Sequence, residues 1–186
     1  MFKSILGSIG IAAIVLLMFF IIIYNKLIRI KNLVSEAWSG IDVQLKRRYD
    51  LIPNLVATVK GYSEHESNVL TKVTQLRTIA MGAHSAEEKI KAETALTSSL
   101  KSLFAVAENY PELKANQNFI HLQKDLSTIE EQLQLARRYY NAVAREYNNS
   151  IQTFPNNLVA NFLNYKSQPF FEINNETERQ APKVSF

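Results

Sequence analysis

The chain has 186 residues, with 21 Lys and Arg against 17 Asp and Glu, and it has no cysteine. This length fits one domain of ordinary size with an appendage. The lack of cysteine excludes a disulfide framework, a thiolate metal site and a cysteine nucleophile. Because there are only five Gly and five Pro, an all-β domain with many tight turns is not expected.

The N-terminal segment is strongly apolar. No charged residue occurs between Ser4 and Asn25. As a helix this stretch would cover roughly 33 Å, against about 30 Å for the hydrocarbon core of a bilayer. A cleaved signal peptide is the alternative, but its apolar region usually has about 7–15 residues and ends in small side chains. Here the run ends in the bulky residues of Phe19–Tyr24, so the sequence predicts an uncleaved membrane anchor.

The charges that flank this segment predict its orientation. Lys3 precedes the segment, whereas Lys26, Arg29 and Lys31 follow it. Lys and Arg accumulate on the cytoplasmic side of membrane helices. We therefore expect a single-pass protein with a short N-terminus outside and a cytoplasmic C-terminal domain.

Beyond the anchor, apolar residues recur every three or four positions, as in helices. The first run extends from Leu27 to Ile52 and meets Pro53, where we expect the helix to kink or to restart, with Asp50 as the cap of a restarted helix. A second run extends from Val56 to Ala80. Ser85 and Glu88 then form a predicted capping box before a third run, Ile90–Ala107, which ends at the helix-breaking segment Asn109–Glu112.

The fourth run, Phe119–Phe154, has the most regular spacing, about 3.5 residues per step, which is typical of a coiled-coil seam. Tyr140 falls on this stripe, and Arg137 and Arg138 fall off it. A helix with such an apolar stripe is not stable when the stripe faces water, so the helices must pack with their apolar stripes against one another. The sequence predicts an all-α protein in which an N-terminal transmembrane helix precedes an antiparallel bundle of about four long helices.

This pattern divides the chain into three parts. Residues 1–25 would form the short N-terminus and the anchor, and residues 26–163 the helical bundle. Residues 164–186 would form a largely irregular tail, because polar residues and proline dominate there. In this tail, Phe170 and Phe171 are expected to dock against the bundle or a partner.

Motifs for catalysis or metal binding are missing from the sequence. His65, His84 and His121 do not have the spacing of a helical zinc motif, and no Glu-x-x-His pair occurs. Glu64, His65 and Glu66 could bind a metal only weakly, and a solvated polar face explains them better. There is also no Gly-rich phosphate loop. The sequence predicts no catalytic residue, cofactor or metal.

Two charged segments allow more than one interpretation. On a helix, Asp42, Lys46 and Asp50 place opposite charges four residues apart. Together with Arg47 they form either a solvated, ion-paired face or a surface for a partner. Lipid contact is not expected, because Lys46 would lie roughly 30 Å beyond the membrane. Nucleic acid is not expected at Arg137 and Arg138, because acidic residues that repel phosphate share their helix: Glu130, Glu131 and Glu146.

The segment Trp38–Val56 resembles the LemA family closely, and the resemblance continues through Thr58–Tyr62, Arg137–Tyr140, Tyr147–Asn148 and Thr153–Leu158. It implies a bacterial inner-membrane protein with one N-terminal membrane helix and a helical domain inside the cell. It brings no established activity. One branch of the family serves in magnetosome membranes, and family genes often neighbour a membrane metalloprotease, which suggests that class as a partner.

Two functions follow as hypotheses. The first is a non-enzymatic, membrane-anchored scaffold or adaptor that holds partner membrane proteins or self-associates, through Asp42, Lys46, Arg47 and Asp50 or through Phe170 and Phe171. The alternative is a membrane-bound enzyme or cofactor binder with a polar site inside the bundle. Its best residues would be Asp42, Arg48, His65 and Tyr140.

Overall fold

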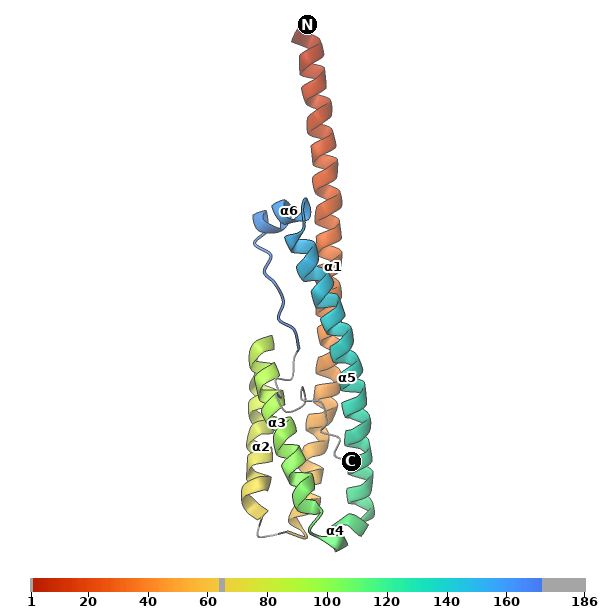
Figure 1. Ribbon diagram of the computed structural model, residues 1–186, viewed down its shortest axis with the longest axis vertical. Helices are drawn as coiled ribbons and strands as arrows, with labels where there is room; N and C mark the ends of the chain where they lie inside the picture. The colour runs from red at the N-terminus through yellow and green to blue at the C-terminus, as the bar shows by residue number, and fades with distance from the viewer. Residues whose placement is uncertain (1, 64–65, 172–186) are drawn as a thin grey trace, which may run out of the picture. The chain divides into compact units, whose positions relative to one another are not determined.

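The computed structural model describes residues 2–63 and 66–171 of the chain, with side chains from Gly7 onward. These residues contain no strand. Their helices are α1 (Phe2–Lys60), α2 (Ser67–Gly82), α3 (Ala86–Ala107), α4 (Pro111–Ala115), α5 (Gln117–Gln152) and α6 (Asn156–Phe162) (Figure 1). The predicted all-α class, with a long apolar helix at the N-terminus, is confirmed.

The described residues form two compact units. The first unit comprises residues 2–41 and Ala136–Phe170, and the second comprises Asp42–Leu135 with Phe171. Because α1 and α5 each cross a unit boundary, both helices contribute residues to both units.

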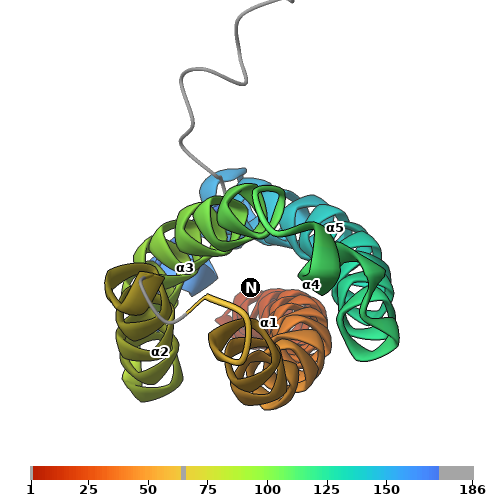
Figure 2. The same cartoon turned by 90° about the horizontal axis from the view of Figure 1, so that it is seen from below.

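In the second unit, the last part of α1, then α2, α3 and the first part of α5 run antiparallel to their neighbours in the chain (Figure 1). Figure 2 shows α2, α3 and α5 around one side of α1, with the opposite side of α1 uncovered. The predicted stripes face inward, and their fully buried members include Leu45, Ile52, Leu96, Leu103 and Leu133. Each such side chain contributes about 1.5–3 kcal/mol through burial.

Of the kink or restart expected at Pro53, the restart is wrong, because α1 continues through this proline to Lys60. Pro53 has no N–H to donate to the carbonyl oxygen of Tyr49, four residues earlier. That oxygen instead accepts a hydrogen bond of 2.7 Å from Nε of Arg77, in α2. Asp50 therefore caps no helix, and the predicted second run is divided between the end of α1 and α2.

The predicted start of α3 is confirmed. Ser85 Oγ accepts from the main-chain N–H of Glu88 at 3.1 Å, and a Glu88 carboxylate oxygen accepts from the Ser85 N–H at 3.3 Å. The helix ends at Ala107, before the predicted breaker. Pro111 then occupies the first position of the short helix α4, where its missing N–H costs no helical hydrogen bond.

In the first unit, the aromatic rings of Trp38 in α1 and Tyr140 in α5 pack edge to face, with centroids 5.1 Å apart. Tyr140 is buried, as predicted.

Arg137 in α5 is buried as well, at 6% exposure, so its predicted position off the stripe is wrong. It lies three residues before Tyr140 and four after Leu133, both buried positions, and a guanidinium on a long stem can occupy such a site when its polar atoms find partners.

The chain after α6 returns along α5. Tyr140 donates from its hydroxyl to the carbonyl oxygen of Pro169 at 2.9 Å. The Asn148 side chain donates to the carbonyl oxygen of Gln168 at 2.9 Å and accepts from the Gln168 N–H at 2.8 Å. These bonds hold a segment without regular structure against a helix, since they satisfy its main-chain polar groups.

Candidate functional site

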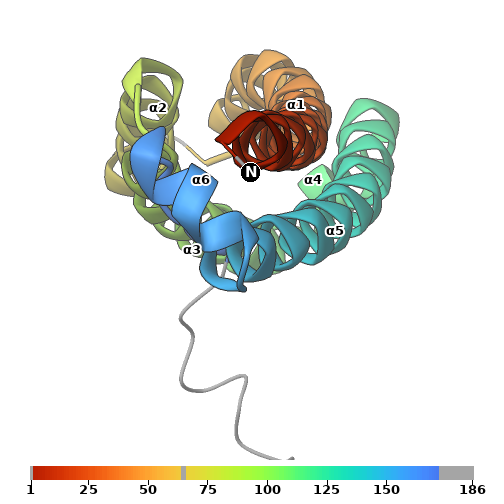
Figure 3. The same cartoon turned by 90° about the horizontal axis from the view of Figure 1, so that it is seen from above.

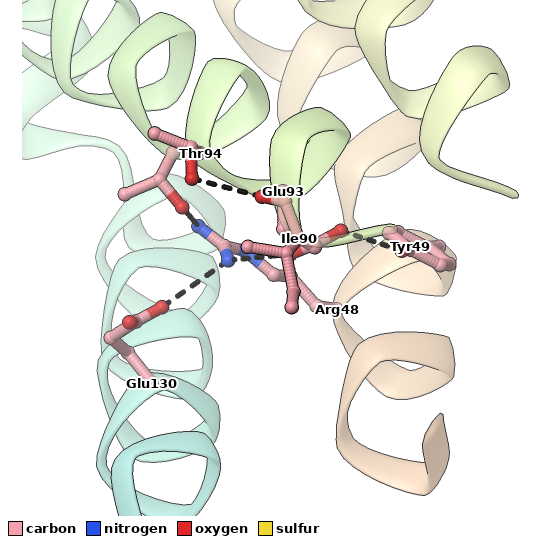
Figure 4. A network of polar contacts seen from close by, with 7 residues as sticks. Arg48, Tyr49, Ile90, Glu93, Thr94 and Glu130 are labelled. Carbon is pink, nitrogen blue, oxygen red and sulfur yellow. Dashed lines mark hydrogen bonds and ion pairs between the residues drawn. The ribbon is translucent and has the colours of Figure 1, made fainter. Parts of the chain in front are cut away.

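The most elaborate polar cluster in the described residues is centred on Arg48, in the second unit (Figure 4). Arg48 is only 4% exposed. Its Nη1 lies 3.2 Å from Oε2 of Glu93 and 3.4 Å from Oε2 of Glu130, and its Nη2 donates to Thr97 Oγ1 at 3.1 Å. The guanidinium thus connects α1 to α3 and α5. We call Arg48, Tyr49, Glu93, Thr97 and Glu130 the Arg48 cluster.

Tyr49 completes the surroundings of Glu93. Its hydroxyl donates to the second carboxylate oxygen, Oε1, at 2.5 Å. Burial, followed by the adjacent negative charge of Glu93, raises the pKa of Tyr49 far above its ordinary value. Tyr49 therefore stays a neutral donor at physiological pH. Both oxygens of Glu93, a residue only 1% exposed, have a partner.

The two carboxylates that face Arg48 differ in their contact with solvent. The side chain of Glu93 is 1% exposed and that of Glu130 is 31% exposed. Removing a charge from water costs several kcal/mol, which only close partners can offset. Glu93 consequently depends on Arg48, whereas Glu130 keeps much of its hydration.

A cleft of about 420 Å³ opens beside the cluster, between α3 and the first part of α5. Its lining combines charged, hydroxyl and apolar side chains, among them Arg48, Thr97, Lys101, Phe104 and Glu130. This volume suits a small polar molecule. In the described residues no group of three or more His, Asp or Glu side chains could hold a metal ion.

The charged residues predicted as a partner surface lie on α1 and are paired in two ways. Lys46 Nζ contacts Asp50 Oδ2 at 3.3 Å, and their side chains are 78% and 59% exposed. Asp42 pairs with Lys89 of α3 at 3.1 Å instead of with Lys46. Arg47 is exposed and donates to the Gln44 side chain at 3.1 Å. Lys46, Arg47 and Asp50 are thus exposed residues on one face of α1.

The two tail aromatics have different surroundings. Phe170 is 38% exposed, and Phe171 is 4% exposed. Phe170 is therefore the ring that the structure offers to solvent. Of the residues named for a polar site inside the bundle, Arg48 and Asp42 belong to the second unit and Tyr140 to the first. Glu64 and His65 lie outside the described residues, as does the tail beyond Phe171.

The sequence model of the LemA family matches residues 37–186 of the chain. The chain belongs to the LemA family. It is also similar to Protein LemA of Metamycoplasma hominis, with 27% identity over 156 residues that cover 83% of this chain and 71% of the relative. The part that matches the LemA family includes every residue of the Arg48 cluster.

The sequence did contain a signal for Glu93, which was not predicted as a site residue. Glu93 precedes Leu96, Leu100 and Leu103 by three, seven and ten positions, so it lies on the buried stripe of α3. Arg48 lies in the same way between Leu45 and Ile52 in α1. One acid and one base on the apolar stripes of two helices indicate a buried ion pair, since neither could be buried alone.

Proposed function

We propose that this LemA family protein is a membrane-anchored helical scaffold or adaptor. The observation that carries the proposal is the exposed apolar part of α1. From Ile9 to Ile22 its large apolar side chains are all at least 37% exposed. The helix is long and apolar enough to cross a membrane. A helix that is apolar on every side and not covered by protein is stable when lipid surrounds it.

The flanking charges support the orientation of the anchor. Lys26, Arg29 and Lys31 follow the apolar stretch and are exposed, which favours a cytoplasmic C-terminal domain in the bacterial inner membrane. Because the chain has no cysteine, single cysteines test this orientation cleanly. Lys91→Cys should resist a membrane-impermeant maleimide in intact cells and react after lysis. Labelling in intact cells would reverse the proposed orientation.

The exposed face of α1 around Val43 is the surface that we propose for a partner. Val43 is 58% exposed, and the exposed residues Lys46, Arg47 and Asp50 follow it by three, four and seven positions, so they share its helix face and add both signs of charge. An exposed apolar residue with charged neighbours suits a protein helix of complementary charge. The partner would be a second copy of the chain or another membrane protein, with a membrane metalloprotease as the class that the family resemblance suggests.

Photocrosslinking in native membranes tests this surface. A photoreactive amino acid at Arg47 should give adducts of defined mass, and mass spectrometry would identify the partner. The same amino acid at Lys72, an exposed cation of α2, is the matched control and should give none. Absence of any adduct at Arg47, with the protein intact in the membrane, would contradict the proposed surface.

The cleft beside the Arg48 cluster supports a second candidate function, the binding of a small polar molecule. Thermal unfolding of the full chain in detergent, measured against a panel of charged metabolites, should then show a rise in Tm for one chemical class. Ser127→Trp would fill the cleft from α5 at an exposed position and should abolish the shift without lowering the basal Tm. Equal shifts in both proteins would exclude the cleft as the site.

A further inference from the structure

Three large apolar side chains are exposed in and just before α6. Phe154 is 78% exposed, Leu158 is 62% exposed and Phe162 is 77% exposed. Leu158 and Phe162 are four residues apart, so they share one face of the helix. The other face carries the buried residues Val159 and Ala160. A short helix thus packs its small apolar residues inward and presents its large ones outward, the reverse of the usual arrangement in water.

The turn that follows α6 brings Tyr165 against α1. Asn164 has a φ of 54°, in the left-handed region that asparagine tolerates. The N–H of Asn164 bonds to the carbonyl oxygen of Asn161, and the N–H of Tyr165 bonds to that of Ala160, which together form a Schellman motif. Tyr165 then turns toward α1, where Nζ of Lys31 lies 5.0 Å from the centroid of its ring.

The same part of α1 contains the end of the apolar stretch. Ile22 is 64% exposed, but Ile23 is 5% exposed and Leu27 is fully buried. Protein therefore begins to cover α1 within the last turn of the apolar stretch. Burial raises the pKa of Tyr165, and the hydroxyl of Tyr24 raises it further. Figures 1 and 3 show α6 beside α1 in this region.

We propose that Phe154, Leu158 and Phe162 insert into the interfacial layer of the membrane that α1 spans. The inference rests on the proposed membrane anchoring and adds a second contact with the same bilayer. Lipid is the occupant that the structure favours, because α6 lies beside α1 near the end of its lipid-facing stretch and cations surround it. Phenylalanine and leucine on the apolar face of a helix that lies in the interface are typical of such contacts.

The charge around this surface agrees with a membrane interface. Lys26, Arg29 and Lys31 of α1 and Lys166 after α6 are exposed. Cations at this depth attract the anionic headgroups of a cytoplasmic leaflet. The aliphatic stems of lysine and arginine also let the apolar side chains enter the acyl region while the charges stay in water.

Nitroxide accessibility in lipid vesicles tests the contact. Single cysteines are introduced into the full chain at Phe162, at Leu16 in the apolar stretch and at Ile79 in α2, and each is spin-labelled. Ile79 is the matched control, since it is 59% exposed and no membrane contact is proposed for it. The vesicles contain phosphatidylethanolamine and phosphatidylglycerol. Power saturation then compares collisions with oxygen, which enters bilayers, and with a nickel chelate, which stays in water.

We expect the label at Phe162 to collide more with oxygen than with nickel, the label at Leu16 to do so more strongly, and the label at Ile79 to show the opposite. Preferential nickel collisions at Phe162 with a membrane-embedded Leu16 would overturn the interfacial contact and leave the anchor intact. Weak collisions with both reagents would mean that protein covers Phe162, which also overturns it. A water-exposed label at Leu16 would instead remove the anchor itself.

Discussion

Nε of Arg77 lies 2.7 Å from the main-chain oxygen of Tyr49, and this is the oxygen that Pro53 leaves without its usual helical donor. A side chain from α2 thus supplies a hydrogen bond that α1 cannot make for itself. The second unit thereby retains a proline in the interior of a long helix.

This relationship predicts a strong coupling between Arg77 and Pro53. Arg77→Met should lower the free energy of unfolding by about 1.5–3 kcal/mol, because a part-buried carbonyl loses a charged donor. In a Pro53→Ala background the restored N–H can bond to Tyr49, so the same substitution should cost less than half as much. Urea unfolding of the four proteins in detergent measures the coupling as a double-mutant cycle. Equal costs in both backgrounds would contradict it.

The Arg48 cluster predicts unequal effects for its two carboxylates. Arg48→Met should cost about 3–5 kcal/mol, because it leaves the Glu93 charge buried and without its cation. Glu130→Gln should cost less than about 1 kcal/mol, since Glu130 is partly solvated. Arg48→Met combined with Glu93→Leu should regain part of the loss. If the double variant were less stable than Arg48→Met alone, the uncompensated charge would not be the cause.

The buried hydroxyl of Tyr49 should make the folded protein less stable in alkaline solution. Its pKa is raised in the folded state above the ordinary value of 10.0, so the folded state keeps a proton that the unfolded chain loses above about pH 10. The contribution of this group is fully present below pH 10 and declines as the pH rises beyond it. The stability difference between wild type and Tyr49→Phe should therefore be constant between pH 7 and 9 and shrink above pH 10. A difference independent of pH up to 11 would be inconsistent with the buried phenol.

Loss of the Asn148 side-chain hydrogen bonds should allow the segment after α6 to open locally. Asn148→Leu removes both the donor to the Gln168 carbonyl and the acceptor of the Gln168 N–H, so both bonds to Gln168 are lost. We expect hydrogen exchange at the Gln168 amide to accelerate at least tenfold, equivalent to about 1.4 kcal/mol. Asn149→Leu, at the exposed neighbouring position, is the control and should leave this exchange unchanged. Similar acceleration in both variants would show that the two Asn148 bonds do not protect this amide.

Much of the fold could be predicted because it depends on local chemistry. The capping box of Ser85 and Glu88 needs only residues three positions apart, and the apolar stripes follow from the 3.6-residue period of a helix. The break before Pro111 has the same origin. These features are properties of short segments, whatever those segments later pack against.

Two of the errors concern residues whose state depends on distant partners. Pro53 should kink or end a helix by its own chemistry, and Arg77 of α2 offsets part of that cost. Glu93 was missed because its burial follows from Arg48, 45 residues earlier in the chain. The third error is local, since Arg137 lies three residues before Tyr140 and four after Leu133, both buried positions of α5.

The sequence by itself determined the apolar stretch of α1, the helical class and both ends of α3, because solvation and backbone preference act on residues close together. Only the tertiary structure decided which charged groups are buried, that Arg77 donates to the oxygen that Pro53 leaves without a donor, and that Phe154, Leu158 and Phe162, in and just before α6, are exposed. The physical reason is that burying a polar group costs free energy unless a partner bonds to it, and the fold supplies such partners from distant segments.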